Sequence, residues 1–312
     1  MDMLFIPEIF DKLNLPPDVI GLSCEKSSRQ IGEILRERLK LSAEQVEEII
    51  QLAKERRIRF GDAAVALRYA TANEVLIALS EQFQYPYVPQ SQRNTSAELV
   101  MLHDPFSQQA EGIRAIRSQV MRHVFRDPEG PLALAVLSPD TRDGKTFFIA
   151  NLAVALAQMG GRTLVVDADL RGPRLHDVFH VENTAGLTSA LLGRNDLQII
   201  QPVNDIPQLY VLPAGIVPPN PLELLERPAF GMLMSKLTAH FDHVLVDTPA
   251  AVYGTDAQVV ADHCGAALLV ARKDASRMAS MQGLINTLSQ SPARLVGMIF
   301  NEFKEPPAKR RA

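Results

Sequence analysis

The sequence predicts an α/β protein, in which a doubly wound parallel sheet carries a phosphate-binding loop and follows a small, mainly helical repeat domain. Strand-like apolar runs alternate with helical segments from residue 132 to residue 301, which is the pattern of a parallel sheet with helical crossovers. Gly144, Lys145 and Thr146 stand between the first of these runs and a helical segment, as they do in a phosphate-binding loop. A repeat with an offset of 29 residues precedes this region.

The composition is that of an ordinary globular protein. The 312 residues suggest two domains, and 46% of them are hydrophobic at a mean hydropathy near zero. The net charge of −4 gives no argument for a nucleic-acid partner, and Cys24 and Cys264 indicate free thiols of a reducing compartment. No apolar run approaches the roughly 18 residues of a membrane span. We therefore expect a cytoplasmic protein that meets a membrane only through a partner.

The repeat occupies residues 29–88, after an N-terminal arm of residues 1–28. Each unit is predicted to form a short helix, a turn and a second helix, which begins at Ser42 in one unit and at Thr71 in the other. Each of these residues is followed three positions later by Gln or Glu, the spacing of a capping box. The predicted shared core consists of apolar residues at helical spacing, namely Val46, Ile49, Ile50, Leu52, Val75, Leu76, Ala78 and Leu79.

Polar, turn-rich residues 89–108 are predicted to link the two domains. The α/β domain then covers residues 109–301, and a tail of residues 302–312 is not expected to extend the fold. The first helix of the α/β domain, residues 109–128, has an apolar face and a charged side. The charged residues Glu111, Arg114 and Arg117 would ordinarily form a solvated face.

The phosphate-binding loop lies within residues 132–159. A buried strand over 132–137 leads into the turn 138–146, and a helix over 147–159 follows. Backbone N–H groups would cradle the phosphates, Lys145 would reach the β- and γ-oxygens, and the Thr146 hydroxyl would bind magnesium. Pro139 stands where a strict motif has glycine.

Carboxylates follow two further buried strands. Asp167 and Asp169 come after the strand over residues 163–166, and Asp247 ends the strand that begins at His243. Because ligands bind at the carboxyl ends of parallel strands, we expect these acids to meet the phosphate-binding loop at one edge of the sheet. The alternative is a set of unrelated surface acids.

The remaining segments continue the alternation. Strands are predicted at 208–212, 265–271 and 294–301, and helices at 186–193, from 222, at 230–240, at 256–262 and at 278–288. His176 and His180 have the spacing of zinc ligands on a helix, but the sequence places no third ligand near them. We therefore do not expect a zinc site there.

The repeat resembles the N-terminal domain of type II secretion and pilus-assembly ATPases, the MshEN type. The second unit keeps Arg59, Gly61 and Gln82 of the family motif and has Arg68 in place of a glycine, whereas the first unit retains almost none of it. In some members the repeats bind cyclic di-GMP, so the resemblance makes this nucleotide a candidate ligand. A helical docking module without a nucleotide is the other interpretation.

Residues 109–301 resemble the bacterial tyrosine kinases of exopolysaccharide export, which belong to the MinD/ParA-like branch of P-loop NTPases. The resemblance rests on the loop 138–146, the second Walker motif within 165–171, the Walker B strand 244–249 and the helix with Glu111, Arg114 and Arg117. The segment 219–225 is also typical of this family. A repeat domain ahead of such a kinase resembles the EpsG type of chain length determinant protein tyrosine kinase.

This resemblance implies the roles of individual residues. Lys145, Asp167 and Asp169 would be catalytic, with Asp167 as the base toward a tyrosine hydroxyl, whose ordinary pKa is near 10. Magnesium would be held by Thr146, Asp167 and Asp247. Oligomerisation into a ring would use Glu111, Arg114 and Arg117. The residues implied to bind ATP are Ser138, Asp143, Gly144, Lys145, Thr146, Phe147 and Arg171.

The resemblance also implies a partner and a cellular role. The partner would be the cytoplasmic segment of an inner-membrane polysaccharide chain-length determinant, which would place this chain at the periphery of the inner membrane. The kinase would then regulate exopolysaccharide chain length, polymerisation and export.

The sequence departs from the family pattern in two places. Arg142 replaces a loop glycine, which would allow positive φ or close approach to phosphate, and the tail after Asn301 lacks the usual tyrosine cluster. Two functions therefore stay open: an active protein-tyrosine kinase, or a catalytically weak or inactive nucleotide-responsive regulator of polysaccharide export, with cyclic di-GMP as a candidate signal.

Overall fold

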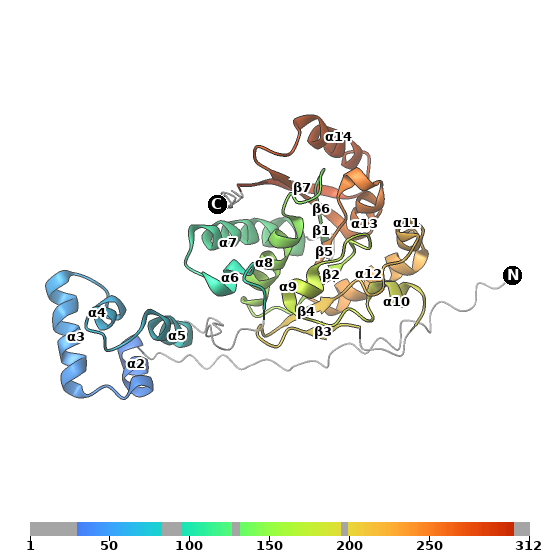
Figure 1. Ribbon diagram of the computed structural model, residues 1–312. Coiled ribbons are helices and arrows are strands. Elements are labelled where there is room, and N and C mark those ends of the chain that lie inside the picture. Colours follow the sequence, from blue (N-terminus) through green and yellow to red (C-terminus); the bar gives the residue numbers. More distant parts are fainter. Residues whose placement is uncertain (1–29, 83–94, 127–131, 195–198, 303–312) are drawn as a thin grey trace, which may run out of the picture. The chain divides into compact units, whose positions relative to one another are not determined.

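The computed structural model describes residues 30–82, 95–126, 132–194 and 199–302 (Figure 1). These residues form two compact units, a helical unit within residues 30–82 and an α/β unit within residues 95–302. The predicted arm of residues 1–28 lies outside the described residues, as does almost all of the predicted tail.

The helical unit contains four helices: α2 (Ile31–Leu39), α3 (Ala43–Arg56), α4 (Phe60–Ala66) and α5 (Ala72–Gln82). Both predicted capping boxes are confirmed. The Ser42 backbone N–H donates to Gln45 Oε1 at 2.9 Å, and the Thr71 backbone N–H donates to Glu74 Oε2 at 2.7 Å. These bonds satisfy N–H groups that the first helical turn leaves unpaired, so they fix where α3 and α5 begin.

Most of the predicted core of this unit is confirmed. Ile49, Val75 and Ala78 are buried, and α2 packs on α5 while α3 packs on α4. The prediction is wrong for Ile50, which is 40% exposed because it lies about 100° further around α3 than Ile49. Gly61 is needed for packing, since a Cβ there would approach Val75 Cγ1 to 2.5 Å.

The α/β unit is built on a seven-stranded sheet in the order β3-β4-β2-β5-β1-β6-β7. Its strands are β1 (Ala133–Leu137), β2 (Thr163–Asp167), β3 (Gln201–Pro202), β4 (Leu209–Leu212), β5 (His243–Asp247), β6 (Gly265–Arg272) and β7 (Arg294–Asn301). Every neighbouring pair is parallel except β3 with β4. The predicted doubly wound parallel sheet is therefore confirmed, with a short antiparallel edge strand added.

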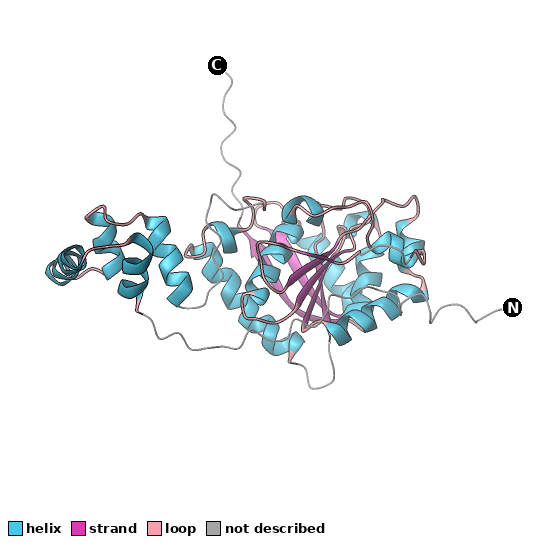
Figure 2. Cartoon of the chain, turned by 90° about the horizontal axis from the view of Figure 1, so that it is seen from below, coloured by secondary structure: helices cyan, strands magenta, loops and turns pink. Residues whose placement is uncertain are grey.

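Helices cover both faces of this sheet (Figures 1 and 2). One face is covered by α6 (Val100–His103), α7 (Gln108–Val120), a π-helical extension (Met121–Phe125), α8 (Lys145–Ala157) and α9 (Leu175–Phe179). The other face is covered by α10 (Leu187–Leu191), α11 (Pro221–Leu225), α12 (Pro228–His240), α13 (Asp256–Cys264) and α14 (Met278–Leu288). A short 3₁₀ turn, η3 (Ala251–Tyr253), precedes α13.

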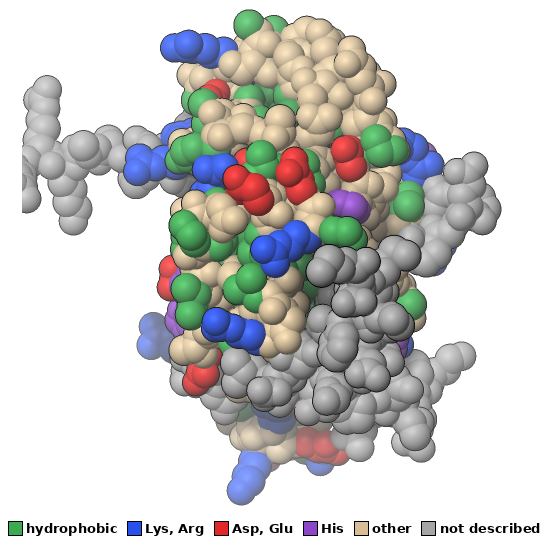
Figure 3. Space-filling model, turned by 90° about the vertical axis from the view of Figure 1, so that its right-hand side faces the viewer, with side chains coloured by type: hydrophobic (Ala, Val, Ile, Leu, Met, Phe, Trp, Pro, Cys, Tyr) green, Lys and Arg blue, Asp and Glu red, His purple; other side chains and the backbone are tan. Residues whose placement is uncertain are grey.

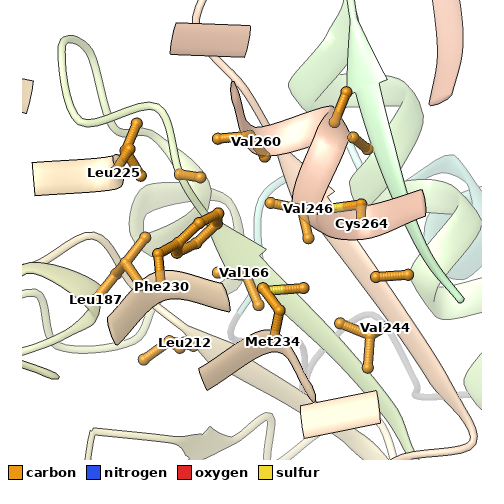
Figure 4. Packing of buried hydrophobic residues seen from close by; sticks show 14 of the residues in the cluster. Val166, Leu187, Leu212, Leu225, Phe230, Met234, Val244, Val246, Val260 and Cys264 are labelled. Carbon is orange, nitrogen blue, oxygen red and sulfur yellow. The ribbon is translucent and has the colours of Figure 1, made fainter. Parts of the chain in front are cut away.

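The two helical layers bury separate apolar cores against the sheet. Figure 4 shows part of the core that α10 to α14 bury against the sheet. In it, Phe230 and Met234 of α12 meet Val166 and Val246 from the neighbouring strands β2 and β5. A strand that is buried on both faces must be apolar throughout, and β1, β2 and β5 are fully buried. The sheet is thus a rigid base for the loops at its carboxyl edge.

The structure corrects the predicted linker for its described part, residues 95–108. Leu99, Met101 and Leu102 are buried in the core that contains α8. The Met101 N–H donates to Asn151 Oδ1 at 3.1 Å, and Asn151 Nδ2 donates to the Glu98 carbonyl at 2.9 Å. This segment therefore belongs to the α/β unit. The helix predicted over residues 109–128 is α7, which begins at residue 108 and becomes π-helical from residue 121.

The surface of the described part carries both signs of charge. On the face in Figure 3, basic and acidic side chains lie interspersed among apolar ones. Among the helices that the structure describes, none is both long enough and apolar enough to cross a lipid bilayer.

Candidate active site

The carboxyl ends of β1, β2 and β5 bring the predicted site together. β5 lies between β1 and β2, and in the strand register Asp247 is the Cα partner of both Val136 and Asp167. The phosphate-binding loop starts directly after β1. The predicted meeting of this loop with two strand-end acids is therefore found.

Lys145 is held over the phosphate-binding loop. Its Nζ donates to Ser138 Oγ at 3.0 Å, and Ser138 Oγ donates to the Asp140 carbonyl at 2.6 Å. Lys145 is the first residue of α8 and is only 7% exposed. A buried ammonium at a helix N-terminus favours an anion beside it, so this arrangement fits a phosphate group.

The backbone of the loop requires glycine at position 144. Gly144 has φ +101°, and a Cβ at this position would clash with the side-chain amide nitrogen of Asn301. The Asn301 amide instead donates to the Asp143 carbonyl at 3.0 Å. The last residue of β7 thus lies against the phosphate-binding loop.

Arg142 adopts the conformation that the family glycine would favour. Its φ is +63°, in the left-handed region, and its side chain is exposed. A residue with a Cβ is strained there by roughly 1–2 kcal/mol. The loop therefore keeps its turn despite the substitution, at a cost in stability.

Asp143 serves as a support for the loop within the protein. Its Oδ2 accepts a bond from the Asp140 N–H at 3.0 Å, and its Oδ1 accepts one from Ser276 Oγ at 2.8 Å. Ser276 Oγ also accepts a bond from the Arg272 N–H at 2.8 Å. The carboxylate of Asp143, which the resemblance assigns to ATP binding, thus accepts bonds from within the loop and from the turn after β6. Phe147 is half-buried in the first turn of α8.

Thr146 and Asp247 form the pair expected to hold magnesium. Thr146 Oγ1 donates to Asp247 Oδ2 at 2.6 Å. Asp247 is 1% exposed, and its Oδ1 has no hydrogen-bond partner among the described residues. Burial raises the pKa of Asp247 to about 6, although Lys145 and the Thr146 hydroxyl oppose this shift. A buried, unpartnered carboxylate oxygen beside a hydroxyl fits a magnesium ion.

Asp167 is buried at the end of β2. Its Oδ2 accepts bonds from the N–H groups of Arg174 and Leu175, each at 3.0 Å, and its Oδ1 accepts one from Asp169 at 3.2 Å. Burial raises its pKa well above the ordinary range, and the charge of Asp247 raises it further. A carboxylate with a raised pKa is a stronger base, which suits removal of a hydroxyl proton.

Asp169 and Arg171 continue this segment beyond the strand. Asp169 Oδ1 accepts bonds from the N–H groups of Arg171 at 3.2 Å and Gly172 at 2.9 Å, which closes a tight turn. The Arg171 guanidinium, which the resemblance assigns to ATP binding, pairs with both carboxylate oxygens of Asp256, at 3.0 and 3.1 Å. Asp256 is 1% exposed and lies in the first turn of α13.

Sequence reasoning missed three supporting residues, Asp256, Ser276 and Asn301. Asp256 and Ser276 follow parallel strands, and Asn301 ends one. Their position after the carboxyl end of a strand is the feature of the sequence that could have identified them. Within the described residues, no three His, Cys, Asp or Glu side chains are grouped to hold a metal. A magnesium ion here would therefore also need oxygen atoms from a nucleotide or from water.

The three residues expected to mediate oligomerisation lie on α7. Glu111 is 66% exposed, whereas Arg114 is 19% exposed and donates to Glu111 and to the carbonyl of Pro105. Arg117 Nη1 donates to the Ala155 carbonyl at 3.0 Å. In a single chain, both arginines thus contact their own subunit.

The residues of the cyclic di-GMP motif occupy different environments in the helical unit. Arg59 is exposed beside the start of α4, Gln82 is half-buried at the end of α5, and Gly61 is buried against Val75. Arg68 has φ +60°, so the chain makes a left-handed turn where the motif has glycine.

Comparison with known proteins gives one family-level match. Residues 134–311 match the family described as the CobQ/CobB/MinD/ParA nucleotide binding domain. Two protein relatives are the tyrosine-protein kinase wzc of Salmonella typhimurium, with 31% identity over 211 residues, and the putative tyrosine-protein kinase CapB of Staphylococcus aureus, with 30% identity over 212 residues. Each match covers 68% of this chain. It spans 29% of the Salmonella protein and 92% of CapB.

Two solved structures resemble this chain. The kinase domain of the Escherichia coli tyrosine kinase ETK aligns with a TM-score of 0.64 at 28% identity, over 74% of this chain and 96% of that one. The chimerical protein CapA2B2 aligns with a TM-score of 0.62 at 31% identity, over 73% of this chain and 98% of that one.

Proposed function

This chain belongs to the bacterial tyrosine-protein kinases, within the CobQ/CobB/MinD/ParA nucleotide-binding family, and from that premise we propose that it transfers the terminal phosphoryl group of ATP to a tyrosine hydroxyl. The observation that supports this most directly is the arrangement of Lys145, Thr146 and Asp247 at the loop. The ammonium of Lys145 lies over the loop. Asp247 Oδ1, which has no hydrogen-bond partner in the described part of the chain, lies next to the Thr146 hydroxyl.

Each residue of the loop has a defined task in this proposal. The backbone N–H groups before α8 and the Lys145 ammonium bind the phosphates, and Lys145 stabilises negative charge on the transferring group. Thr146, Asp247 and Asp167 would hold a magnesium ion, which would supply positive charge to offset the negative charge of the phosphates. Asp143 keeps the loop in shape through Ser276 and the Asp140 N–H.

Asp167 acts as the general base. The phenolic proton passes to its carboxylate as the tyrosine oxygen approaches phosphorus. Three backbone N–H bonds orient this carboxylate. Two of them go to Oδ2 and one goes to Oδ1, so Oδ1 keeps the free lone pair that accepts the proton. Asp169 helps to place the metal or the substrate, and the Arg171–Asp256 pair anchors the turn that carries Asp169.

A specific observation favours a second candidate, a nucleotide-responsive regulator with little transfer activity. Arg142 lies in a strained conformation of the phosphate-binding loop. Both candidates bind ATP, so the separating measurement is phosphotyrosine formation by the purified chain with MgATP, mapped by mass spectrometry. The kinase predicts phosphotyrosine that Lys145→Ala abolishes. ATP binding without phosphotyrosine would support the regulator.

We place this activity in polysaccharide export on the strength of the family resemblance. The proposed partner is the cytoplasmic segment of an inner-membrane chain-length determinant, which would hold the chain, itself cytoplasmic, at the membrane and couple it to exopolysaccharide chain length, polymerisation and export. A ring of copies assembled through Glu111, Arg114 and Arg117 is part of the same proposal. The exposure of Glu111 supports it.

For the helical unit we keep two proposals, cyclic di-GMP binding and docking without a nucleotide. Arg59 is exposed, as stacking on a guanine and pairing with a phosphate would require. Calorimetric titration of the full chain with cyclic di-GMP separates the two. Heat that is lost in Arg59→Ala supports binding, and no heat in either protein supports the docking module.

A further inference from the structure

The chain has five tyrosines, and the structure describes three of them. Tyr210 is 7% exposed and packs edge-on against Phe241, with ring centroids 5.5 Å apart. Tyr69 donates its hydroxyl to Glu48 at 2.5 Å. Tyr69 is partly buried, whereas Tyr253 is 54% exposed, so among the three Tyr253 is the most accessible to another protein. Tyr85 and Tyr87 lie outside the described residues.

Tyr253 also lies at the edge of the sheet that carries the candidate active site. It ends the 3₁₀ turn η3, six positions after Asp247. The N–H groups of Ala251 and Val252 donate to the carbonyls of Ser138 and Pro139, at 2.9 and 3.0 Å. The segment that carries Tyr253 is therefore attached to the start of the phosphate-binding loop.

The residues around Tyr253 are exposed. Val252 is 64% exposed, Gly254 and Thr255 are exposed, and Gly254 has φ +140°. A kinase must reach the residues on both sides of the acceptor as well as its ring. Residues 252–255 are all exposed and so meet this requirement. A groove of about 420 Å³ beside it, lined by Pro139, Val252, Thr255, Gln258 and Leu284 among others, gives a neighbouring chain a surface to contact.

We propose that Tyr253 of one copy accepts the terminal phosphoryl group of ATP bound to a second copy of this chain. The inference rests on the proposed kinase activity and names its acceptor. The bond between the γ-phosphorus and the ADP oxygen breaks, and the Tyr253 Oη–P bond forms. The phenolic proton passes to Asp167 of the second copy, and MgADP leaves.

Transfer between copies follows from how the segment is fixed. For transfer within one chain, Tyr253 would have to turn back into its own active site. The backbone bonds of Ala251 and Val252 to the phosphate-binding loop oppose this movement. A second copy can present Tyr253 with these bonds intact.

The test mixes two full-length variants that differ in isotope label. Lys145→Ala keeps Tyr253 but cannot transfer, and Tyr253→Phe can transfer but lacks the acceptor hydroxyl. After incubation of the mixture with MgATP, peptide mapping is expected to find phosphate on Tyr253 of the Lys145→Ala copy. Tyr253→Phe alone is expected to lose at least tenfold of the phosphotyrosine signal of the wild type. Its ATP hydrolysis should be unchanged, and Tyr69→Phe should keep the full signal.

The remaining outcomes would overturn the acceptor, the transfer between copies or the kinase activity itself. Phosphate on Tyr69, Tyr85, Tyr87 or Tyr210 of the wild type, with none on Tyr253, would overturn this inference and leave the kinase in place. Phosphate on Tyr253 of the wild type that never reaches the Lys145→Ala copy would overturn transfer between copies. A wild type that binds ATP and forms no phosphotyrosine would overturn the kinase and this inference together.

Discussion

Asp167 and Asp247 lie opposite each other as register partners at the ends of the adjacent parallel strands β2 and β5. Both are buried, and the charge of Asp247 contributes to the raised pKa of Asp167. Two carboxylates side by side in an apolar sheet destabilise the fold unless a proton or a cation is present. This pair therefore links the stability of the protein to pH and to magnesium.

The first prediction concerns pH. The pKa of Asp247 is about 6 in the folded protein, above its ordinary value near 3.9, so the folded state binds the proton more tightly. Its protonation stabilises the folded state at low pH, and this stabilisation is lost as the pH rises through 6. Without magnesium, the unfolding free energy of the wild type should therefore gain roughly 2 kcal/mol relative to Asp247→Asn between pH 7.5 and pH 4.5. Urea unfolding across this range measures the difference, and parallel pH profiles of the two proteins would contradict it.

The second prediction concerns magnesium. Because Asp247 Oδ1 has no hydrogen-bond partner among the described residues, a cation bound there should raise the melting temperature of the wild type in the presence of ADP. Asp247→Asn should remove most of this increase. Asp177→Asn is the matched control, since Asp177 is 73% exposed. An equal magnesium effect in Asp247→Asn would mean that the ion binds elsewhere.

The third prediction concerns the Arg171–Asp256 pair. Asp256→Asn leaves the guanidinium without its bidentate partner and loosens the turn that holds Asp169, so the rate of phosphotyrosine formation should decrease by about tenfold or more. The KM for ATP should change little, because the phosphate-binding loop is held separately by Asp143. Steady-state kinetics separates the two quantities. If KM increased and kcat were unchanged, Arg171 would be a nucleotide contact rather than a support.

The fourth prediction concerns the strain at Arg142. Arg142→Gly removes a left-handed strain of roughly 1–2 kcal/mol and adds the larger unfolded-state entropy of glycine, so the net gain in unfolding free energy should be about 0.5–1 kcal/mol. Calorimetry measures this gain. Arg68→Gly, at φ +60° in the separate helical unit, should relieve similar strain without changing ATP affinity. A loss of stability in Arg142→Gly would show that the arginine side chain has a binding partner in the folded loop.

The fifth prediction concerns Gly144. Gly144→Ala would combine an unfavourable φ of +101° with a clash against the Asn301 amide, so it should abolish measurable ATP binding. Gly112→Ala on α7 meets no atom within 4 Å and should leave binding intact. Fluorescent-nucleotide titration compares the two proteins. Normal affinity in Gly144→Ala would mean that ATP does not use this loop.

The centre of this site was predictable from the sequence because it depends on local pattern. An apolar run followed by Gly144, Lys145 and Thr146 determines strand, loop and helix, and a parallel sheet aligns its strand ends. The meeting of Asp167 and Asp247 follows directly from these two facts.

The supporting bonds were not predictable in the same way. Arg171 and Asp256 are 85 residues apart, and Asp143 and Asn301 are 158 apart. Such pairs depend on the register of distant strands, which apolar periodicity does not reveal. The strand β3 was missed because two residues, Gln201 and Pro202, carry no periodic pattern.

The segment before α7 has the composition of a linker because polar residues surround the short buried helix α6. Asn151, a buried polar residue in the middle of α8, bonds the backbone of Glu98 and Met101 and so holds this segment in place. Burial of this segment is a tertiary effect, which local composition does not report.

The most direct test of the kinase is phosphotyrosine formation by the purified full-length chain with MgATP, measured by mass spectrometry beside Lys145→Ala. We predict phosphate on tyrosine in the wild type and none in Lys145→Ala, with both proteins folded. A wild type that binds ATP yet forms no phosphotyrosine, alone or with the cytoplasmic segment of its proposed partner, would contradict the kinase and identify a nucleotide-responsive regulator.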